Sequence, residues 1–236
     1  DPGTAVTVPL DGVPALPDVE FGNSTTYMPI SAGVDHLVEI FQAGSSTAAL
    51  SATINLTHAM DFSAIATGGA NSWPLALELL VDDNSPPTPG YARIQLGHLA
   101  PFAAGMGTLA DVRHQDGTLI LNDVPFSAIA PAFELPAGVY DLKITSADGA
   151  TTLIDPMPVT FSDGDILAAF AVGDGPKQPL GVFAWPSDQI GFLLDLAANL
   201  RVAHLAPFAM DPGTAVTVTL DGVPALPDVE FGNSTT

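Results

Sequence analysis

The chain has 236 residues, with 26 acidic and 5 basic side chains and a formal net charge of −21 at neutral pH. Nucleic acids and anionic membrane surfaces bind clustered lysine and arginine, so this charge argues against both as partners. Hydrophobic residues make up 47% of the chain, too many for a disordered acidic tail, and the absence of cysteine excludes disulfides and thiolate sites. The longest apolar segments, such as 166–172, are too short to cross a bilayer, so we expect no membrane insertion.

The sequence repeats at two levels. Residues 1–26 recur at 211–236 with 25 of 26 positions identical, and the exception is Pro9, which corresponds to Thr219. This repeat has an offset of 210 residues. A weaker repeat at an offset of 105 or 106 relates Ala32-Gly33-Val34 to the same three residues at 137–139. The sequence therefore predicts a unit of about 105 residues, with two units in each long period.

Strand signals follow one another along the chain. Short β-branched or apolar segments at 5–8, 37–41, 140–145 and 166–172 are separated by Asp-Gly pairs and by 22 prolines and 22 glycines in total. Short strands with frequent turn signals are typical of β-sandwiches. We predict an all-β protein of two tandem immunoglobulin-like β-sandwich units of about 105 residues, repeating every 210 residues.

Composition sets the expected boundaries, because the proline-rich stretch after residue 83 cannot form a sheet ladder and favours an extended spacer. We expect unit A at 1–83, a linker at 84–90 and unit B at 91–188. A second linker is expected at 189–199, and the start of the next unit A at 200–236. Unit A at 1–83 lacks its opening strand, whose repeat equivalent is 200–210. We expect apolar cores formed by Phe21, Leu37, Ile40 and Phe62 in unit A and by Phe126, Leu142, Ile144, Leu167 and Phe170 in unit B.

Two stretches carry a family resemblance. One stretch begins with Arg201, His204, Ala206 and Pro207 and continues with Asp-Gly and Val-x-Phe-Gly. The matching residues in unit B are Arg93, His98, Ala100, Pro101, Phe126 and Pro136-Ala137-Gly138. This pattern resembles a bacterial family, the domain of unknown function DUF4397, over nearly the whole chain, twice. The resemblance implies secreted or surface β-sandwich modules in tandem, and it implies no catalytic residues.

Histidines and acidic turns are the candidates for chemistry. His98 and His204 each precede Leu-Ala-Pro-Phe at a strand end. One histidine per unit makes a poor metal site. We expect each of these histidine rings to cap a backbone group instead. His36, His58 and His114 have no equivalents in the other unit and are expected at the surface. Asp163-Gly164-Asp165 and Asp82-Asp83-Asn84 have oxygens that calcium could use, but turn formation is the favoured interpretation. We expect no metal, no cofactor and no catalytic residues.

Glycosylation is the remaining site hypothesis. Asn-x-Ser/Thr sequons occur at Asn23, Asn55 and Asn233, and the first and last occupy the same repeat position. Ser85 and Thr88 in the proline-rich linker are candidates for O-linked sugars.

Three classes of function remain open. A near-identical repeat favours a structural extracellular or cell-surface filament or stalk, whose partners are further copies of itself along a fibre, because a polymer propagates one junction geometry. A surface adhesin or ligand-binding module is the alternative. An enzyme is disfavoured, because no nucleophile, acid or base constellation appears.

Overall fold

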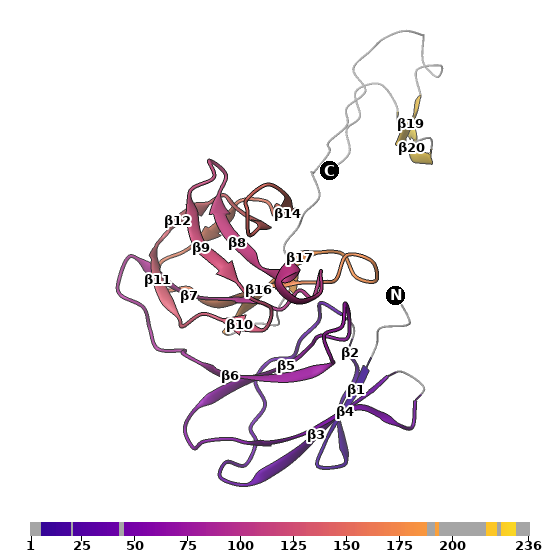
Figure 1. The fold of residues 1–236 in the computed structure, drawn as a ribbon, viewed down its shortest axis with the longest axis vertical. Helices are drawn as coiled ribbons and strands as arrows, with labels where there is room; N and C mark the ends of the chain where they lie inside the picture. Colours follow the sequence, from indigo (N-terminus) through magenta and orange to yellow (C-terminus); the bar gives the residue numbers. More distant parts are fainter. Residues whose placement is uncertain are drawn as a thin grey trace. The chain divides into compact units, whose positions relative to one another are not determined.

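The computed structural model describes residues 6–19, 21–42, 45–187, 192–193, 216–220 and 223–229. Within these residues the regular structure consists of β-strands and one short 3-10 helix, η1 (Gly105–Thr108), so the all-β prediction is confirmed (Figure 1). No helix in this part of the chain is long and apolar enough to span a membrane. Residues 1–196 form one compact unit and residues 197–236 form another.

The first sheet has the order β2-β1-β3-β4 and contains β1 (Val6–Leu10), β2 (Val13–Val19), β3 (Asp35–Gln42) and β4 (Ala48–Asn55). β1 and β2 are joined by Asp11 and Gly12, both at positive φ, which is the two-residue turn that an Asp-Gly pair favours in a hairpin. The carboxylate of Asp11 also accepts the backbone N–H of Leu37 at 2.8 Å, which ties the turn to β3.

Strand β3 corrects two expectations. Its burial alternates, with His36, Val38 and Ile40 buried and Leu37 42% exposed. Side chains on a strand alternate between the two faces, so Leu37 and Ile40 cannot both point inward in a regular strand. The expectations of a buried Leu37 and a surface His36 were therefore wrong.

The second half of the compact unit repeats this pairing. Its four-stranded sheet has the order β14-β13-β8-β9, so β8 and β9 form the hairpin, β13 pairs with β8, and β14 pairs with β13, as β1, β2, β3 and β4 do. These strands are β8 (Ala110–His114), β9 (Leu119–Val124), β13 (Leu142–Ser146) and β14 (Thr152–Ile154).

A second hairpin also occurs in both halves. β5 (Asp61–Thr67) pairs with β6 (Ala76–Asp82), and β16 (Ile166–Val172) pairs with β17 (Gly181–Pro186). Adding 105 to each residue of the first hairpin reproduces the pairing of the second: Phe62 opposite Val81 corresponds to Leu167 opposite Pro186. The two hairpins thus have the same register, although β17 is one residue shorter than β6.

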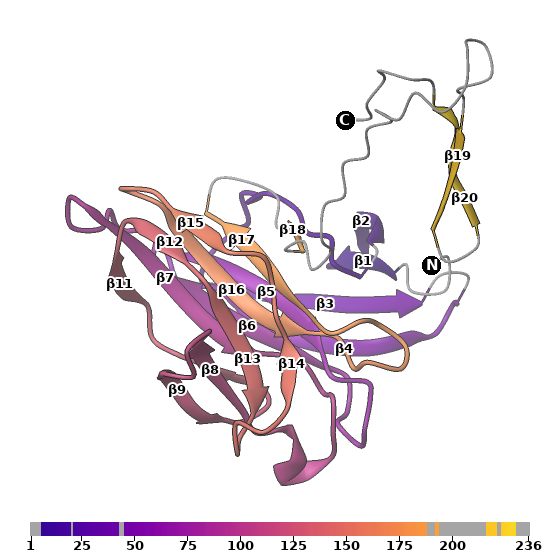
Figure 2. The same ribbon diagram turned by 90° about the horizontal axis from the view of Figure 1, so that it is seen from above.

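Strand β16 has a further partner. It pairs in parallel with β7 (Tyr91–His98), within a sheet of order β10-β7-β16-β17-β18 in which β11 also pairs with β7 (Figure 2). The remaining strands of this half are β10 (Ala128–Ile129), β11 (Phe133–Pro136), β12 (Gly138–Tyr140), β15 (Val159–Phe161) and β18 (Phe192–Leu193), and β12 pairs with β15.

The β7-β16-β17 sheet is covered on both faces. On one face Ile94 and Phe161 form a core with half-buried residues of β11, β12 and β15. On the other face Phe170 packs with Leu80, so the β5–β6 hairpin lies against this sheet (Figure 1). Burial on both faces explains why β16 is apolar throughout instead of alternating.

The linker expected at 84–90 therefore does not separate two independent cores. Asn71 Nδ2 donates to the carbonyl of Pro101 at 2.6 Å, and Trp73 Nε1 donates to that of Ala103 at 2.9 Å, so the end of the β5–β6 hairpin is bonded to the chain after β7. Of the linker itself, the N–H of Gly90 donates to Asp163 at 2.6 Å. The second linker, 189–199, and residues 200–210 lie outside the described residues apart from β18.

Of the other eight predicted core residues, two are buried and six are half-buried. Phe170 is 1% and Ile40 4% exposed. The half-buried ones are Phe21, Phe62, Phe126, Leu142, Ile144 and Leu167.

The repeated segment near the end of the chain forms a hairpin of β19 (Val216–Leu220) and β20 (Val223–Val229). Its register, from Val216 opposite Val229 to Leu220 opposite Val223, equals that of β1 and β2 shifted by 210 residues. The Pro9-to-Thr219 difference leaves the pairing unchanged, since Pro9 lies opposite Pro14 as Thr219 lies opposite Pro224.

Candidate functional site

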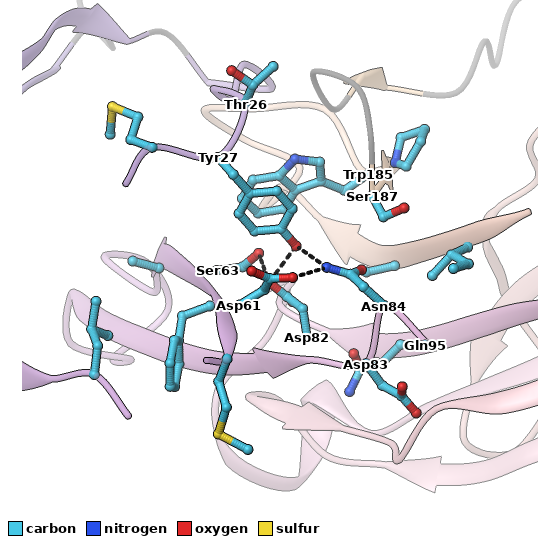
Figure 3. A pocket seen from close by; sticks show the side chains of 18 of the residues that line it. Thr26, Tyr27, Asp61, Ser63, Asp82, Asp83, Asn84, Gln95, Trp185 and Ser187 are labelled. Atoms are coloured by element: carbon cyan, nitrogen blue, oxygen red, sulfur yellow. Dashed lines mark hydrogen bonds between the residues drawn. The ribbon is translucent and has the colours of Figure 1, made fainter. Parts of the chain in front are cut away.

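A pocket of about 370 Å³ lies beside the free edge of β5. It is lined by segment 25–30, by residues 61–64 of β5, and by the chain at 82–84 and at 185–187. We call this cavity the edge pocket, and Figure 3 shows the side chains around it.

A polar cluster occupies the edge pocket (Figure 3). The hydroxyls of Tyr27 and Ser63 both donate to Asp82 Oδ2 at 2.8 Å. Asn84 Nδ2 donates to Asp61 Oδ2 at 2.8 Å and to the Tyr27 hydroxyl at 3.2 Å. The cluster joins three segments that are distant in sequence: the chain after β2, the start of β5, and the end of β6.

Partial burial controls the ionisation of this cluster. Desolvation raises the pKa of Asp82 above its usual value, although its two hydroxyl donors oppose the shift. Desolvation also raises the pKa of Tyr27 to about 12, so the phenol keeps its proton at neutral pH and donates it to Asp82. These groups satisfy one another, and the edge pocket contains no histidine beside them that could serve as a base.

The edge pocket coincides with an incomplete sheet. Among the described residues β5 has one strand partner, β6, whereas its counterpart β16 has two, β17 and β7. Backbone N–H and C=O groups along an unpaired edge are ready to accept another strand.

The structure places His98 in the interior, 2% exposed. Its Nε2 donates to the carbonyl of Thr108 at 2.6 Å, and its Nδ1 faces the N–H of Ala100 at 3.4 Å, which fits a neutral ring. The ring stacks on Phe102 with centroids 5.4 Å apart, and burial lowers the pKa of His98. His98 thus fastens the end of β7 to η1. His204, its repeat equivalent, lies outside the described residues.

The other histidine of interest is His36, which lies 6% exposed under the β1–β2 turn. Its Nδ1 donates to Asp11 Oδ2 at 2.7 Å and its Nε2 donates to the carbonyl of Ser31 at 2.8 Å. Both partners are acceptors, so this arrangement favours the doubly protonated ring, and the bond to Asp11 raises the pKa of His36.

The glycosylation candidates differ in their surroundings. Asn23 is exposed, and Asn55 is exposed with its Nδ2 donating to Asp35 at 2.8 Å. Ser85 and Thr88 are exposed, and the Ser85 hydroxyl bonds to Asp83 and Arg93. Asn233 lies outside the described residues.

The acidic turn at 163–165 is bonded within the protein. Asp163 Oδ1 accepts the N–H of Gly90 at 2.6 Å, and Asp165 Oδ2 accepts that of Ser162 at 2.7 Å. No group of three or more histidine or acidic side chains able to hold a metal occurs in the part of the chain that the structure describes.

Sequence reasoning missed the edge pocket. It considered Asp82-Asp83-Asn84 only as a source of oxygens for calcium, and Tyr27, 55 residues before Asp82, belongs to no motif. A signal was nevertheless present. Residues 28–34 (MPISAGV) align with 133–139 (FELPAGV), and unit A lacks an opening strand before them, so the comparison of the two units predicts a gap at this edge.

Comparison with known families supports the resemblance seen in the sequence. The model of a domain of unknown function, DUF4397, matches residues 2–106. This stretch of the chain is similar to DUF4397 domains. The match covers a stretch as long as the internal repeat rather than the whole chain twice, and it includes β7 at its end. No curated protein matches the chain.

Proposed function

We propose that this chain is a structural repeat of an extracellular filament or cell-surface stalk made of tandem immunoglobulin-like β-sandwich domains. Two units of about 105 residues make up each 210-residue period, and each period joins the next through the same junction. The protein is not an enzyme in this proposal, and its partners are further copies of itself.

The observation that carries the proposal is the recurrence of residues 1–26 at 211–236 with an unchanged hairpin register. Identity at 25 of 26 positions makes the junctions between successive 210-residue periods alike. A fibre requires such equivalent junctions, whereas an enzyme does not. The matching sheet orders of the two halves and the shared register of their second hairpins support the 105-residue unit.

The charge and the sequons fit an exposed fibre. A net charge of −21 makes copies repel one another sideways, which opposes bundling at low salt. Glycans at Asn23, Asn55 and Asn233, or on Ser85 and Thr88, would cover strand edges further.

A ligand-binding adhesin is the second candidate, and the edge pocket with Tyr27 and Trp185 favours it. Against it, the polar groups of the pocket are bonded to one another.

Electron microscopy of the native material tests the main proposal. We expect fibres whose axial repeat corresponds to one or two 105-residue units. Discrete particles that bind a soluble ligand in the edge pocket would favour the adhesin instead.

A further inference from the structure

We propose that the edge pocket is filled by a strand with the sequence of residues 199–205, contributed by the copy of this sequence that precedes residues 1–26 in the repeat, and lying parallel to β5. The strand completes unit A as β7 completes unit B. This inference concerns one site in the fold and does not require that the protein form a filament.

The first argument is the position of β7. In unit B, β7 lies along the edge of β16, from Arg93 opposite Ile166 to His98 opposite Ala171. β5 corresponds to β16 at an offset of 105, with the same hairpin register. The edge of β5 that lines the pocket is therefore the edge to which a parallel strand binds in unit B.

The second argument is the segment 25–30. On its other side β7 pairs with β11, where Phe133 lies opposite Ile94. Residues 28–31 correspond to β11 at an offset of 105, and residues 25–30 also line the pocket. Both neighbours of β7 thus have counterparts that line the cavity, and only the strand between them is missing from the described residues.

The third argument identifies the occupant. His98 to Phe102 (HLAPF) recurs at 204–208, an offset of 106. Applied to the β7–β16 register, this offset places Arg201 opposite Ser63, Val202 opposite Ala64, and Ala203 opposite Ile65.

Side-chain volumes agree with this register. Gly97 lies opposite Phe170, and a Cβ at Gly97 would come within 2.7 Å of the Phe170 ring. The corresponding pair in unit A is Ala203 and Ile65. Ile65 is smaller than Phe170, so it leaves room for the methyl group of Ala203, whereas Phe170 leaves no room for a Cβ at position 97. The replacement of Gly by Ala on one strand is thus matched by the replacement of Phe by Ile on the other.

Charge agrees as well. Arg201 is one of 5 basic residues in the chain, and the register brings it opposite Ser63, whose hydroxyl binds the half-buried Asp82. A cation beside Asp82 and Asp61 would offset the desolvation that raises the pKa of Asp82.

The preceding copy is the fitting donor, because residues 199–210 are followed by 211–236, the copy of 1–26. A donor on a separate chain would bring its own β19–β20 hairpin. That hairpin pairs as β1–β2 does and would compete with β1–β2 for the place beside β3.

The test adds the sequence of residues 197–210 before Asp1 of the full chain. Because the chain has no cysteine, one engineered pair is unambiguous: Ala64→Cys together with Val202→Cys in the added segment. Neighbouring strands are about 4.8 Å apart, within the Cα range for disulfides. We expect a disulfide within the monomer on mild oxidation, whereas moving the second cysteine to Ala203, on the other face, abolishes it.

Two outcomes would overturn the proposal. One is equal or absent cross-linking for both positions. The other concerns the chain without the added segment, carrying Ala64→Cys and Val202→Cys. If this chain forms the disulfide within the monomer, its own residues 199–205 fill the pocket and no preceding copy is needed.

An exchange of volumes provides a second, independent measurement. The added segment should raise the unfolding temperature, Ile65→Phe should abolish that rise, and Ala203→Gly in the added segment should restore it, recreating the Gly97–Phe170 pair. A rise that is insensitive to both changes would contradict the register. If the cross-link forms while the native material shows no fibres, the filament proposal fails and this one stands.

Discussion

Gly97 lies opposite Phe170 where β7 meets β16, and a Cβ on the glycine would come within 2.7 Å of the phenylalanine ring. Phe170, 1% exposed, packs on the other side against Leu80 of the β5–β6 hairpin. The ring therefore fills a space that exists only because residue 97 has no side chain.

Gly97→Ala should destabilise the protein by about 1–3 kcal/mol through overpacking. Phe170→Ile alone should also cost stability, because it leaves a cavity, but the double variant should be more stable than the sum of the single effects predicts. Urea unfolding of the four proteins measures the coupling. Strict additivity would mean that the two residues do not compete for the same space.

His98 should make stability fall in acid. Burial lowers its folded pKa below the ordinary 6.5, so below about pH 6.5 the unfolded chain takes up a proton that the folded one does not. The stability contributed by the neutral ring is complete above that pH and is lost as the pH falls through the folded pKa. The difference in unfolding free energy between the natural protein and His98→Gln should shrink from pH 7.5 to pH 5, and a difference independent of pH would contradict this.

His36 should have the opposite effect. Its bond to Asp11 raises its folded pKa above 6.5, so its contribution is complete below that pH and is lost as the pH rises through the folded pKa. The loss of stability in His36→Gln should therefore be largest near pH 5.5 and smaller at pH 8.5. Asp11→Asn serves as the matched variant, and it should reduce the pH dependence to the same extent.

Glycosylation is tested by mass. We expect the native protein to exceed the mass of the bare polypeptide, with the extra mass mapping to peptides that contain Asn23, Asn55, Asn233, Ser85 or Thr88. Asn55 gives the most stringent test, because a glycan on its Nδ2 must coexist with the hydrogen bond from this atom to Asp35. An intact mass equal to that of the polypeptide would exclude the coating and leave the filament proposal in place.

Local chemistry made much of the fold predictable. The Asp-Gly pair at 11–12 predicts a tight turn whatever surrounds it, because its positive φ angles suit these residues. The β-branched segment at 5–8 predicts a strand before the turn, and the offset of 210 predicts that residues 1–26 and 211–236 take the same conformation. Each of these features depends on residues that are close in sequence or identical.

Pairings between distant residues decided the rest. Leu37 and His36 are neighbours on β3, so their side chains lie on opposite faces of the strand. Either side chain could be buried, and only the packing of β3 against the rest of the protein determines that His36 is the buried one. The sequence alone determined that the chain is all-β, and it predicted a repeated unit that lacks its first strand. Only the tertiary structure showed where this gap would lie, because segment 25–30 and β5, more than thirty residues apart in the sequence, line the same pocket.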